Sequence, residues 1–274
     1  MSADMKDLEA RGLVLLGCGK MGSAMLEGWL AQGLPAGSVW VNDPYPSEWL
    51  SALEGLNLNA DLPTNPAIVL VAVKPQMMTD ALPTLASLGN GTTLFLSVAA
   101  GTPIATYEAM VGDQTPIIRA MPNTPAAVGR GITAICGNSR ATAAHMDMAE
   151  TLLSAVGQVV RLEGEHQMDA VTAVSGSGPA YVFHLIETLA AAGVAQGLSP
   201  ALSMQLAKAT VGGAGALAEN ASDDPAQLRK NVTSPGGTTA AALEVLMNEA
   251  DGFPSLLTRA VAAAANRSKE LANG

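Results

Sequence analysis

The distribution of hydrophobic residues divides the chain into two parts. From residue 13 to about residue 161, short apolar runs alternate with helical patterns. The runs are LVLLG (13–17), SVWVN (38–42), AIVLVAV (67–73), TTLFLSV (92–98), PIIRA (116–120), ITAIC (132–136) and GQVVRL (157–162). Continuous apolar runs that alternate with helices are typical of strands buried on both faces of a sheet. This part is therefore predicted to be an α/β domain with a largely parallel, doubly covered sheet.

Helical periodicity dominates from Gln167 to the end of the chain. Proline and glycine residues lie where its helices are expected to begin or end, namely Pro179, Gly193, Pro200, Pro225, Pro235 and Pro254. The pattern predicts an α/β domain over residues 1–163 and an all-α domain over 164–274. Small-residue runs such as AAAGVAQG and VGGAGALA suit close helix contacts, either within the chain or between subunits. We expect a ligand site in the cleft between the two domains.

Composition and charge favour an enzyme or a small-ligand binder. The 274 residues are 49% hydrophobic, and the formal net charge is −10 with singly scattered Lys and Arg. Such a chain lacks the clustered cations that bind nucleic acid or anionic membranes, so neither partner is expected. The start MSADMKDLEARG does not resemble a secretory signal, and the cytoplasm is the expected compartment. Cys18 and Cys136 lack metal-ligand spacing; we expect both to be reduced and buried, with no metal site.

A glycine motif follows the first predicted strand. Gly17, Gly19 and Gly22 form a G-x-G-x-x-G pattern, and apolar residues then repeat at helical spacing. In this context the glycines permit a tight turn and close approach of a pyrophosphate. The backbone N–H groups and the dipole at the helix start attract its charge. The first domain is therefore predicted to bind a dinucleotide.

The ends of the next strands leave the choice of cofactor open. Asp43 favours the ribose 2′-hydroxyl of NAD, whereas Asn42 and Ser47 could serve the 2′-phosphate of NADP, although no Arg is close in sequence. In VAVKPQ, Lys74 and Pro75 lie at the strand end where open sheets bind ligands. A solvated lysine is the alternative interpretation.

Two further loops and the histidines are ambiguous. RAMPNTPAAVG (119–129) could hold Asn123 and Thr124 outward, or could be an ordinary structural turn. VSGSGPAY opens the helical part, with Pro179 at the first helical position. His184 is expected to be a core residue. We expect the remaining histidines, His145 and His166, and the acidic residues of EGEHQMD to be solvated.

The segment NVTSPGGTTAAALEVL (231–246) has hydroxyls and glycines in its turn but no His, Cys, Asp or Lys. Thr238 and Thr239 are predicted at the N-cap and first turn of the following helix. Backbone N–H groups, hydroxyls and the helix dipole together could bind an anion, and a simple N-cap is the alternative. A second anion-binding loop, far along the chain from the glycine motif, favours a carboxylated substrate.

The motifs GCGKMG, VAVKP, SVAAG, MPNTP, SGSGPAY and SPGGTT, in this order, closely resemble those of the pyrroline-5-carboxylate reductase family over residues 13 to about 270. The resemblance implies a Rossmann-type dinucleotide-binding domain followed by an all-α dimerisation domain. It implies reduction of 1-pyrroline-5-carboxylate to L-proline by hydride from NADPH, with NADH possible, in a homodimer or a higher homo-oligomer. A reductase of six-membered cyclic imines and a nucleotide-binding protein without turnover are the rival interpretations.

The resemblance also implies site residues. Those for the cofactor are Leu16, Gly17, Cys18, Gly19, Lys20, Met21, Asn42, Asp43, Asn59, Ala72, Val73, Lys74, Pro75, Ala100 and Asn231. Those for the substrate carboxylate are Ser234, Gly237 and Thr238, with the catalytic Thr239 hydroxyl near the ring nitrogen. A protonated cyclic imine is already an electrophile, so positioning beside the nicotinamide suffices. Asp43 is acidic where many relatives carry a hydroxyl or small residue, which leaves the choice between NADPH and NADH open.

Overall fold

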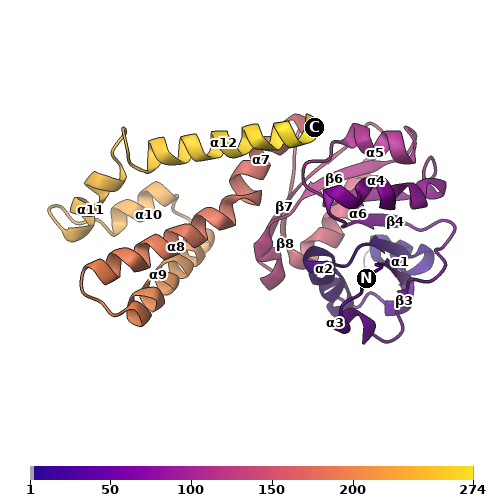
Figure 1. Ribbon diagram of the computed structural model, residues 1–274, viewed down its shortest axis with the longest axis horizontal. Helices are drawn as coiled ribbons and strands as arrows, with labels where there is room; N and C mark the ends of the chain where they lie inside the picture. Colours follow the sequence, from indigo (N-terminus) through magenta and orange to yellow (C-terminus); the bar gives the residue numbers. More distant parts are fainter. Residues whose placement is uncertain (1–2, 274) are drawn as a thin grey trace. The chain divides into compact units, whose positions relative to one another are not determined.

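The computed structural model describes residues 3–273, and their strands form one eight-stranded sheet in the order β3-β2-β1-β4-β5-β6-β7-β8 (Figure 1). The strands are β1 (Leu13–Leu16), β2 (Val39–Asn42), β3 (Asn57–Leu58), β4 (Ile68–Val71), β5 (Leu94–Ser97), β6 (Ile117–Met121), β7 (Gly131–Gly137) and β8 (Gly157–Arg161). Neighbouring strands are parallel except β6 and β7, which are antiparallel. The order β3-β2-β1-β4-β5 is that of a Rossmann dinucleotide-binding fold. The predicted parallel-dominated sheet is confirmed.

The helices associated with the sheet are α1 (Ala3–Arg11), α2 (Lys20–Ala31), α3 (Glu48–Ser51), α4 (Met78–Ala81), α5 (Ile104–Val111), α6 (Ala143–Leu153) and α7 (Met168–Val171). Each face of the sheet has its own core. Leu15 of β1 packs with Trp29 of α2 and Leu152 of α6, whereas Val14 shares the opposite core with Tyr107 of α5. Side chains alternate across a strand, so every strand residue is buried when both faces are covered.

The rest of the chain is helical, as predicted, with α8 (Gly178–Ala195), α9 (Pro200–Asn220), α10 (Pro225–Asn231), α11 (Thr238–Leu246) and α12 (Phe253–Asn273). Two of these helices begin with a capping side chain followed by proline. Ser199 accepts a hydrogen bond from the Leu202 N–H, and Asp224 accepts one from the Gln227 N–H. Such caps satisfy N–H groups that have no partner within the helix.

The chain divides into two compact units after Gly176. The first contains the sheet and, from Ala265 onward, the end of α12; the second is Ser177–Ala264. The predicted boundary near residue 163 follows the last strand, but the first unit extends further along the chain. Met168 of α7 is buried in one core of the sheet, and Ser268 Oγ of α12 donates to Asp169 Oδ1 at 2.6 Å.

The second unit covers few of its own apolar side chains. The buried residues of α8 and α9 are Ala190, Ser203 and Ala207, all small. In contrast, Phe183 is 60% exposed and Leu217 is 58% exposed. None of the described helices combines the length and hydrophobicity that a membrane span requires.

Candidate active site

The glycine motif forms a tight turn between β1 and α2. Gly17 has φ +84°, and a Cβ there would lie 2.9 Å from Val73 Cγ1. A Cβ at Gly22 would lie 2.7 Å from the Gly17 carbonyl oxygen. A Cβ at Gly19 would meet no atom within 4 Å. The first and third glycines are therefore required by the fold, whereas the second leaves open space beside the start of α2, where a ligand can approach.

The start of α2 has unsatisfied backbone donors. Its N-cap is Gly19, and no side chain caps the first turn. The loop before it is held by the neighbouring strands, since the Gly17 N–H donates to the Asn42 carbonyl oxygen at 2.8 Å. The Ala72 N–H donates to the Leu16 carbonyl oxygen at the same distance. A rigid loop that leads into an uncapped helix start is suited to binding a phosphate group.

The Asp43 carboxylate binds the glycine loop. Its Oδ2 accepts from the Cys18 N–H at 2.7 Å, and its Oδ1 accepts from the Tyr45 N–H at 2.8 Å. Asn59 holds the Asp43 backbone from both sides, because its Oδ1 accepts from the Asp43 N–H at 2.9 Å and its Nδ2 donates to the Asp43 carbonyl oxygen at 2.8 Å. Both carboxylate oxygens thus have a structural task in addition to the predicted role at the ribose.

The two cysteines are free and buried, as expected. Burial, with a smaller contribution from the Asp43 charge, raises the pKa of the Cys18 thiol to about 11. Burial also raises the pKa of Cys136 to about 11. Both thiols are therefore neutral near neutral pH and are poor nucleophiles. In residues 3–273 no three His, Cys, Asp or Glu side chains gather as a metal site would require.

The remaining cofactor candidates of the first unit lie at the same sheet edge. Ala72, Val73 and Lys74 directly follow β4, and Lys74 is exposed. The side chain of Pro75 lies outside the described part of the structure. Ala100 is exposed in the loop after β5. Because β1, β2, β4 and β5 are parallel, their carboxyl ends meet at one edge, where Rossmann folds bind dinucleotides.

Asn123 of the MPNTP motif serves the fold. Its Nδ2 donates to the Ser175 carbonyl oxygen at 3.1 Å, and its Oδ1 accepts from the Ile132 N–H at 3.0 Å. The amide thus joins the loop after β6 to β7 and to the π-helix Thr172–Gly176. These contacts favour the structural-turn interpretation of this motif over an amide held outward.

The SPGGTT segment forms a glycine-dependent turn at the start of α11. Gly236 has φ +69°, the Gly237 N–H donates to the Ser234 carbonyl oxygen at 3.1 Å, and a Cβ at Gly237 would lie 2.5 Å from Ser234 Oγ. The N-cap is Gly237, with no side-chain hydrogen bond, and Thr238 is the first helical residue. The predicted N-cap at Thr238 is therefore wrong, because this turn brings the extended backbone of Gly237 into the cap position.

The threonines of this turn are available to a ligand. Thr239 is half-buried, and among the described residues its hydroxyl has no hydrogen-bond partner. Ser234 and Thr238 are exposed. The first turn of α11 therefore offers backbone N–H groups and hydroxyls together, as a carboxylate site requires.

Asn231, the last residue of α10, is engaged within the second unit. Its Oδ1 accepts from Gln227 Nε2 at 2.7 Å, and its Nδ2 donates to Asp223 Oδ2 at 3.1 Å. Its side-chain amide is exposed in the described chain. A cofactor contact by Asn231 remains a prediction.

The three histidines differ in exposure and in their hydrogen-bond partners. His184 was expected in the core, but its side chain is 74% exposed and its Nδ1 lies 3.2 Å from Glu187 Oε2, because no other part of the second unit covers this face of α8. His145 was expected to be solvated but is half-buried, because its Nδ1 accepts from the Thr142 N–H at 3.1 Å in the capping box of α6. His166 is exposed, as expected.

Sequence reasoning missed one part-buried ion pair. Glu165 was expected to be solvated, but its Oε1 lies 2.7 Å from Nη1 of Arg119, which is only 4% exposed. The same oxygen accepts from the Ile104 N–H at 2.9 Å. The available signal was the position of Arg119 inside the apolar run PIIRA, since a charge in a buried strand requires a partner.

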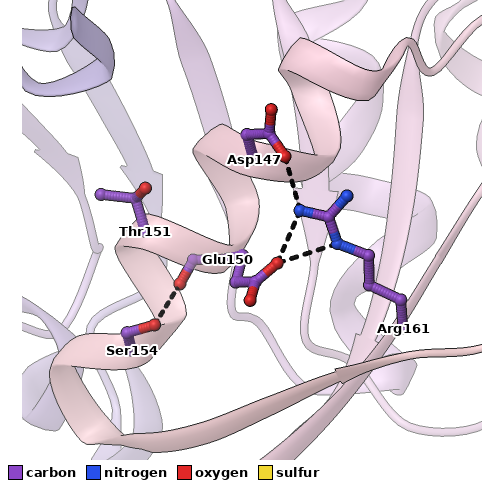
Figure 2. A pocket seen from close by; sticks show the side chains of 5 residues that line it. All are labelled: Asp147, Glu150, Thr151, Ser154 and Arg161. Carbon is purple, nitrogen blue, oxygen red and sulfur yellow. Dashed lines mark hydrogen bonds and ion pairs between the residues drawn. The ribbon is translucent and has the colours of Figure 1, made fainter. Parts of the chain in front are cut away.

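A surface hollow of about 410 Å³ between α6 and β8 is unrelated to these loops (Figure 2). Arg161 Nη2 lies 2.6 Å from both Asp147 Oδ1 and Glu150 Oε2. Ser154 Oγ donates to the Glu150 carbonyl oxygen. The charges in the hollow bind one another, so this feature does not point to a cofactor.

The comparisons with known proteins agree with this geometry. Residues 165–271 match the family model described as pyrroline-5-carboxylate reductase dimerisation, and residues 13–101 match that described as NADP oxidoreductase coenzyme F420-dependent. The pyrroline-5-carboxylate reductase of Pseudomonas aeruginosa is 39% identical, with 95% of this chain and 96% of that protein covered. That of a Synechocystis species is 47% identical, with 74% of each covered.

Solved structures are similar over almost the whole chain. A pyrroline-5-carboxylate reductase from Coxiella burnetii matches with a TM-score of 0.89 and 32% identity, covering 95% of this chain and 98% of that one. The Plasmodium falciparum pyrroline carboxylate reductase with NADP bound matches with a TM-score of 0.80 and 31% identity, covering 96% and 99%. With its glycine loop, its SPGGTT turn and these full-length relatives, the chain belongs to the pyrroline-5-carboxylate reductase family.

Proposed function

We propose that this protein reduces 1-pyrroline-5-carboxylate to L-proline with NADPH as the electron donor. The observation that carries the proposal is the SPGGTT turn. Its helix start has no side-chain cap, and its Thr239 hydroxyl has no hydrogen-bond partner among the described residues, which suits a small carboxylate with a polar ring atom. Relatives that match nearly the full length of the chain are named pyrroline-5-carboxylate reductases. A nucleotide-binding protein without turnover would not need this second anion-binding turn.

The residues of the glycine loop fit a dinucleotide. The open space beside Gly19 admits a pyrophosphate, and the uncapped N–H groups of α2 can bind it. The P. falciparum relative is described with NADP bound, which supports NADPH here. We propose NADH as a second, less favoured cofactor because Asp43 lies at the end of β2, where acidic residues bind an unphosphorylated ribose.

The turn before α11 positions the imine. Ser234, Gly237 and Thr238 bind its carboxylate through hydroxyl and backbone N–H groups, and the Thr239 hydroxyl hydrogen-bonds at the ring nitrogen. When bound, the reduced nicotinamide supplies the hydride. When the imine nitrogen is protonated, the adjacent ring carbon is already electrophilic. This chain therefore needs to orient the ring and exclude misaligned poses. Positioning of this kind can lower a barrier by ~7–11 kcal/mol in the best intramolecular cases.

We further propose that the enzyme is a homodimer that works in the cytoplasm. The second unit exposes large apolar side chains such as Phe183, Leu206 and Leu217, and a second copy would cover them. Residues 165–271 match a family model for dimerisation. Two buried, unpaired cysteines suit a reducing compartment.

Steady-state oxidation of NADPH by the purified protein with racemic 1-pyrroline-5-carboxylate tests the proposal. We expect turnover with this imine, weaker turnover with NADH, and little with a six-membered cyclic imine carboxylate. If neither reduced cofactor is oxidised with any cyclic imine, the protein is not a reductase of this class. Preference for the six-membered ring would reassign the substrate and leave the reaction type unchanged.

A further inference from the structure

Glu165, Arg119 and Ile104 form a part-buried clasp that joins three segments distant in sequence. Glu165 Oε1 accepts from the Ile104 N–H at 2.9 Å and from Arg119 Nη1 at 2.7 Å. Ile104 is the first residue of α5, whose N-cap Pro103 provides no side-chain hydrogen bond. Glu165 therefore performs, from a position 61 residues further along the chain, the task that a capping side chain usually performs.

The clasp fixes the end of the loop Val98–Pro103, and a second set of contacts fixes its beginning. Ser97 Oγ and the Tyr107 hydroxyl are hydrogen-bonded in the interior, and the Ala99 N–H donates to Ser97 Oγ at 3.2 Å. Arg119 lies beside Ser97 in the β5–β6 register. Both ends of the loop are thus attached to buried polar groups, while Ala100 in its middle is exposed.

Among the described residues, Glu165 is the hydrogen-bond and ion-pair partner of Arg119. Arg119 is 4% exposed, and its Nη2 is buried with no hydrogen-bond partner in the described part of the chain. Glu165 is one third exposed and lies on the connection after β8. A buried guanidinium without its carboxylate would be strongly unfavourable, so loss of the Glu165 charge must disturb its surroundings.

Strand order places this loop beside the reactive half of a dinucleotide. The pyrophosphate loop follows β1, and the adenosine side lies at β2, on one side of β1. The nicotinamide half of the dinucleotide must then extend toward β4 and β5, on the opposite side of β1. The loop Val98–Pro103 directly follows β5 at that edge.

We propose that Glu165 is a positioning residue that, through Ile104 and Arg119, holds the loop Val98–Pro103 against the nicotinamide half of the cofactor. This inference rests on the proposed function. It assigns a task to a carboxylate on the connection after β8, within the first unit and distant in sequence from every predicted cofactor contact. Its removal should affect the nicotinamide half of the cofactor and leave the adenosine half unaffected.

The variant Glu165→Gln keeps the size of the side chain and an acceptor oxygen but removes the charge. Calorimetric titration should show NADP⁺ bound at least about threefold more weakly. The affinity for 2′,5′-ADP, which carries only the adenosine half, should be unchanged. The kcat with NADPH should fall while the KM for the imine stays at the wild-type value. A merely structural role would lower the melting temperature and leave the ratio of the two nucleotide affinities unchanged.

Glu150→Gln is the matched control, since it weakens another Arg–carboxylate pair, on α6, which packs on the opposite face of the sheet. If Glu165→Gln does not fold, the double variant Arg119→Met/Glu165→Gln removes the buried unpaired charge and should show the same selective loss. A wild-type ratio of nucleotide affinities in whichever variant folds would overturn the proposal.

Hydrogen exchange of the wild-type protein provides a test that needs no variant. Exchange in residues 98–104 should slow with NADP⁺ and not with 2′,5′-ADP. Equal exchange with both nucleotides would also overturn the proposal. Activity of the wild-type enzyme separates a test of the proposed reaction from a test of the role of Glu165. An inactive wild type refutes the proposed reaction. An active wild type with an unaffected Glu165→Gln variant refutes only the role of Glu165.

Discussion

Thr239→Val tests the proposed substrate site most directly. Thr239 lies in the first turn of α11, half-buried, and no described residue hydrogen-bonds its hydroxyl. Valine has nearly the same shape and the same β-branch, so packing and helix propensity change little. No intramolecular hydrogen bond is lost either. The structure therefore predicts a folded variant with a melting temperature close to that of the wild type.

The kinetic effect should be large by comparison. A hydrogen bond to a charged group contributes ~1.5–3 kcal/mol, which at ~1.4 kcal/mol per decade corresponds to roughly ten- to 150-fold in kcat/KM for the imine. NADP⁺ affinity should be unchanged because Thr239 belongs to the substrate turn. Alanine would be a weaker probe, since it would also leave a cavity.

Thr188→Val is the control. Its hydroxyl donates to the His184 carbonyl oxygen at 2.9 Å within α8 of the same unit, and the residue is exposed. We expect wild-type kinetics from this variant. A wild-type kcat/KM for the imine in Thr239→Val would refute the role of the Thr239 hydroxyl, whatever its melting temperature.

Two further substitutions test other parts of the structure. In Asp43→Asn the amide has one acceptor oxygen and cannot accept from both the Cys18 and Tyr45 N–H groups, so the glycine loop should loosen. The affinities for NADP⁺ and 2′,5′-ADP should then both fall about tenfold, equivalent to ~1.4 kcal/mol. Unchanged affinities in calorimetric titrations would show that the loop does not depend on the carboxylate. A Cβ at Gly212 would meet no atom of another described element within 4 Å. Gly212→Leu should therefore cost ~1–3 kcal/mol through contact with a second copy, and sedimentation should show loss of dimer with loss of activity. A fully active monomer would contradict the homodimer.

Features that depend on residues close in sequence could be predicted well. Each of the seven apolar runs overlaps a strand, and the glycine motif predicted a turn before a helix. These signals are local: an apolar run defines a buried strand, and glycine spacing defines the turn. The strand β3 (Asn57–Leu58) was missed because two residues are too few to form a hydrophobic pattern.

Features that depend on distant partners could not be predicted from the sequence. Asp43 was identified as a ribose ligand from its place after β2, but its contact with Cys18, 25 residues away, has no sequence signature. Glu165 appeared to belong to a polar connector, because nothing nearby indicates that Arg119 approaches it. The expectation that His184 is buried was wrong for a different reason. Burial on α8 would require a partner surface that the second unit itself does not provide.

Helix starts in this structure differ in whether the N-cap side chain forms a hydrogen bond. Ser47, Thr142, Ser199 and Asp224 each accept one from the first turn of their helix. The N-cap residues of α2, α4, α5, α7, α8 and α11 provide none, and in α2 and α11, the two helices proposed to bind anions at their first turn, that residue is glycine. A capping side chain would occupy the N–H groups that a phosphate or carboxylate needs.

Gly19→Ser tests whether the missing cap serves the ligand. The backbone of Gly19 has φ −70° and ψ −162°, which a serine can adopt, and its Cβ would meet no atom within 4 Å. A serine hydroxyl could then cap α2 and stabilise the protein by about a few tenths of a kcal/mol relative to glycine. The same side chain would fill the space where a pyrophosphate approaches and would compete for its N–H donors. We therefore expect equal or slightly higher thermal stability together with weaker NADP⁺ binding; undiminished NADP⁺ affinity in a stable Gly19→Ser variant would mean that the nucleotide does not approach α2 at this glycine.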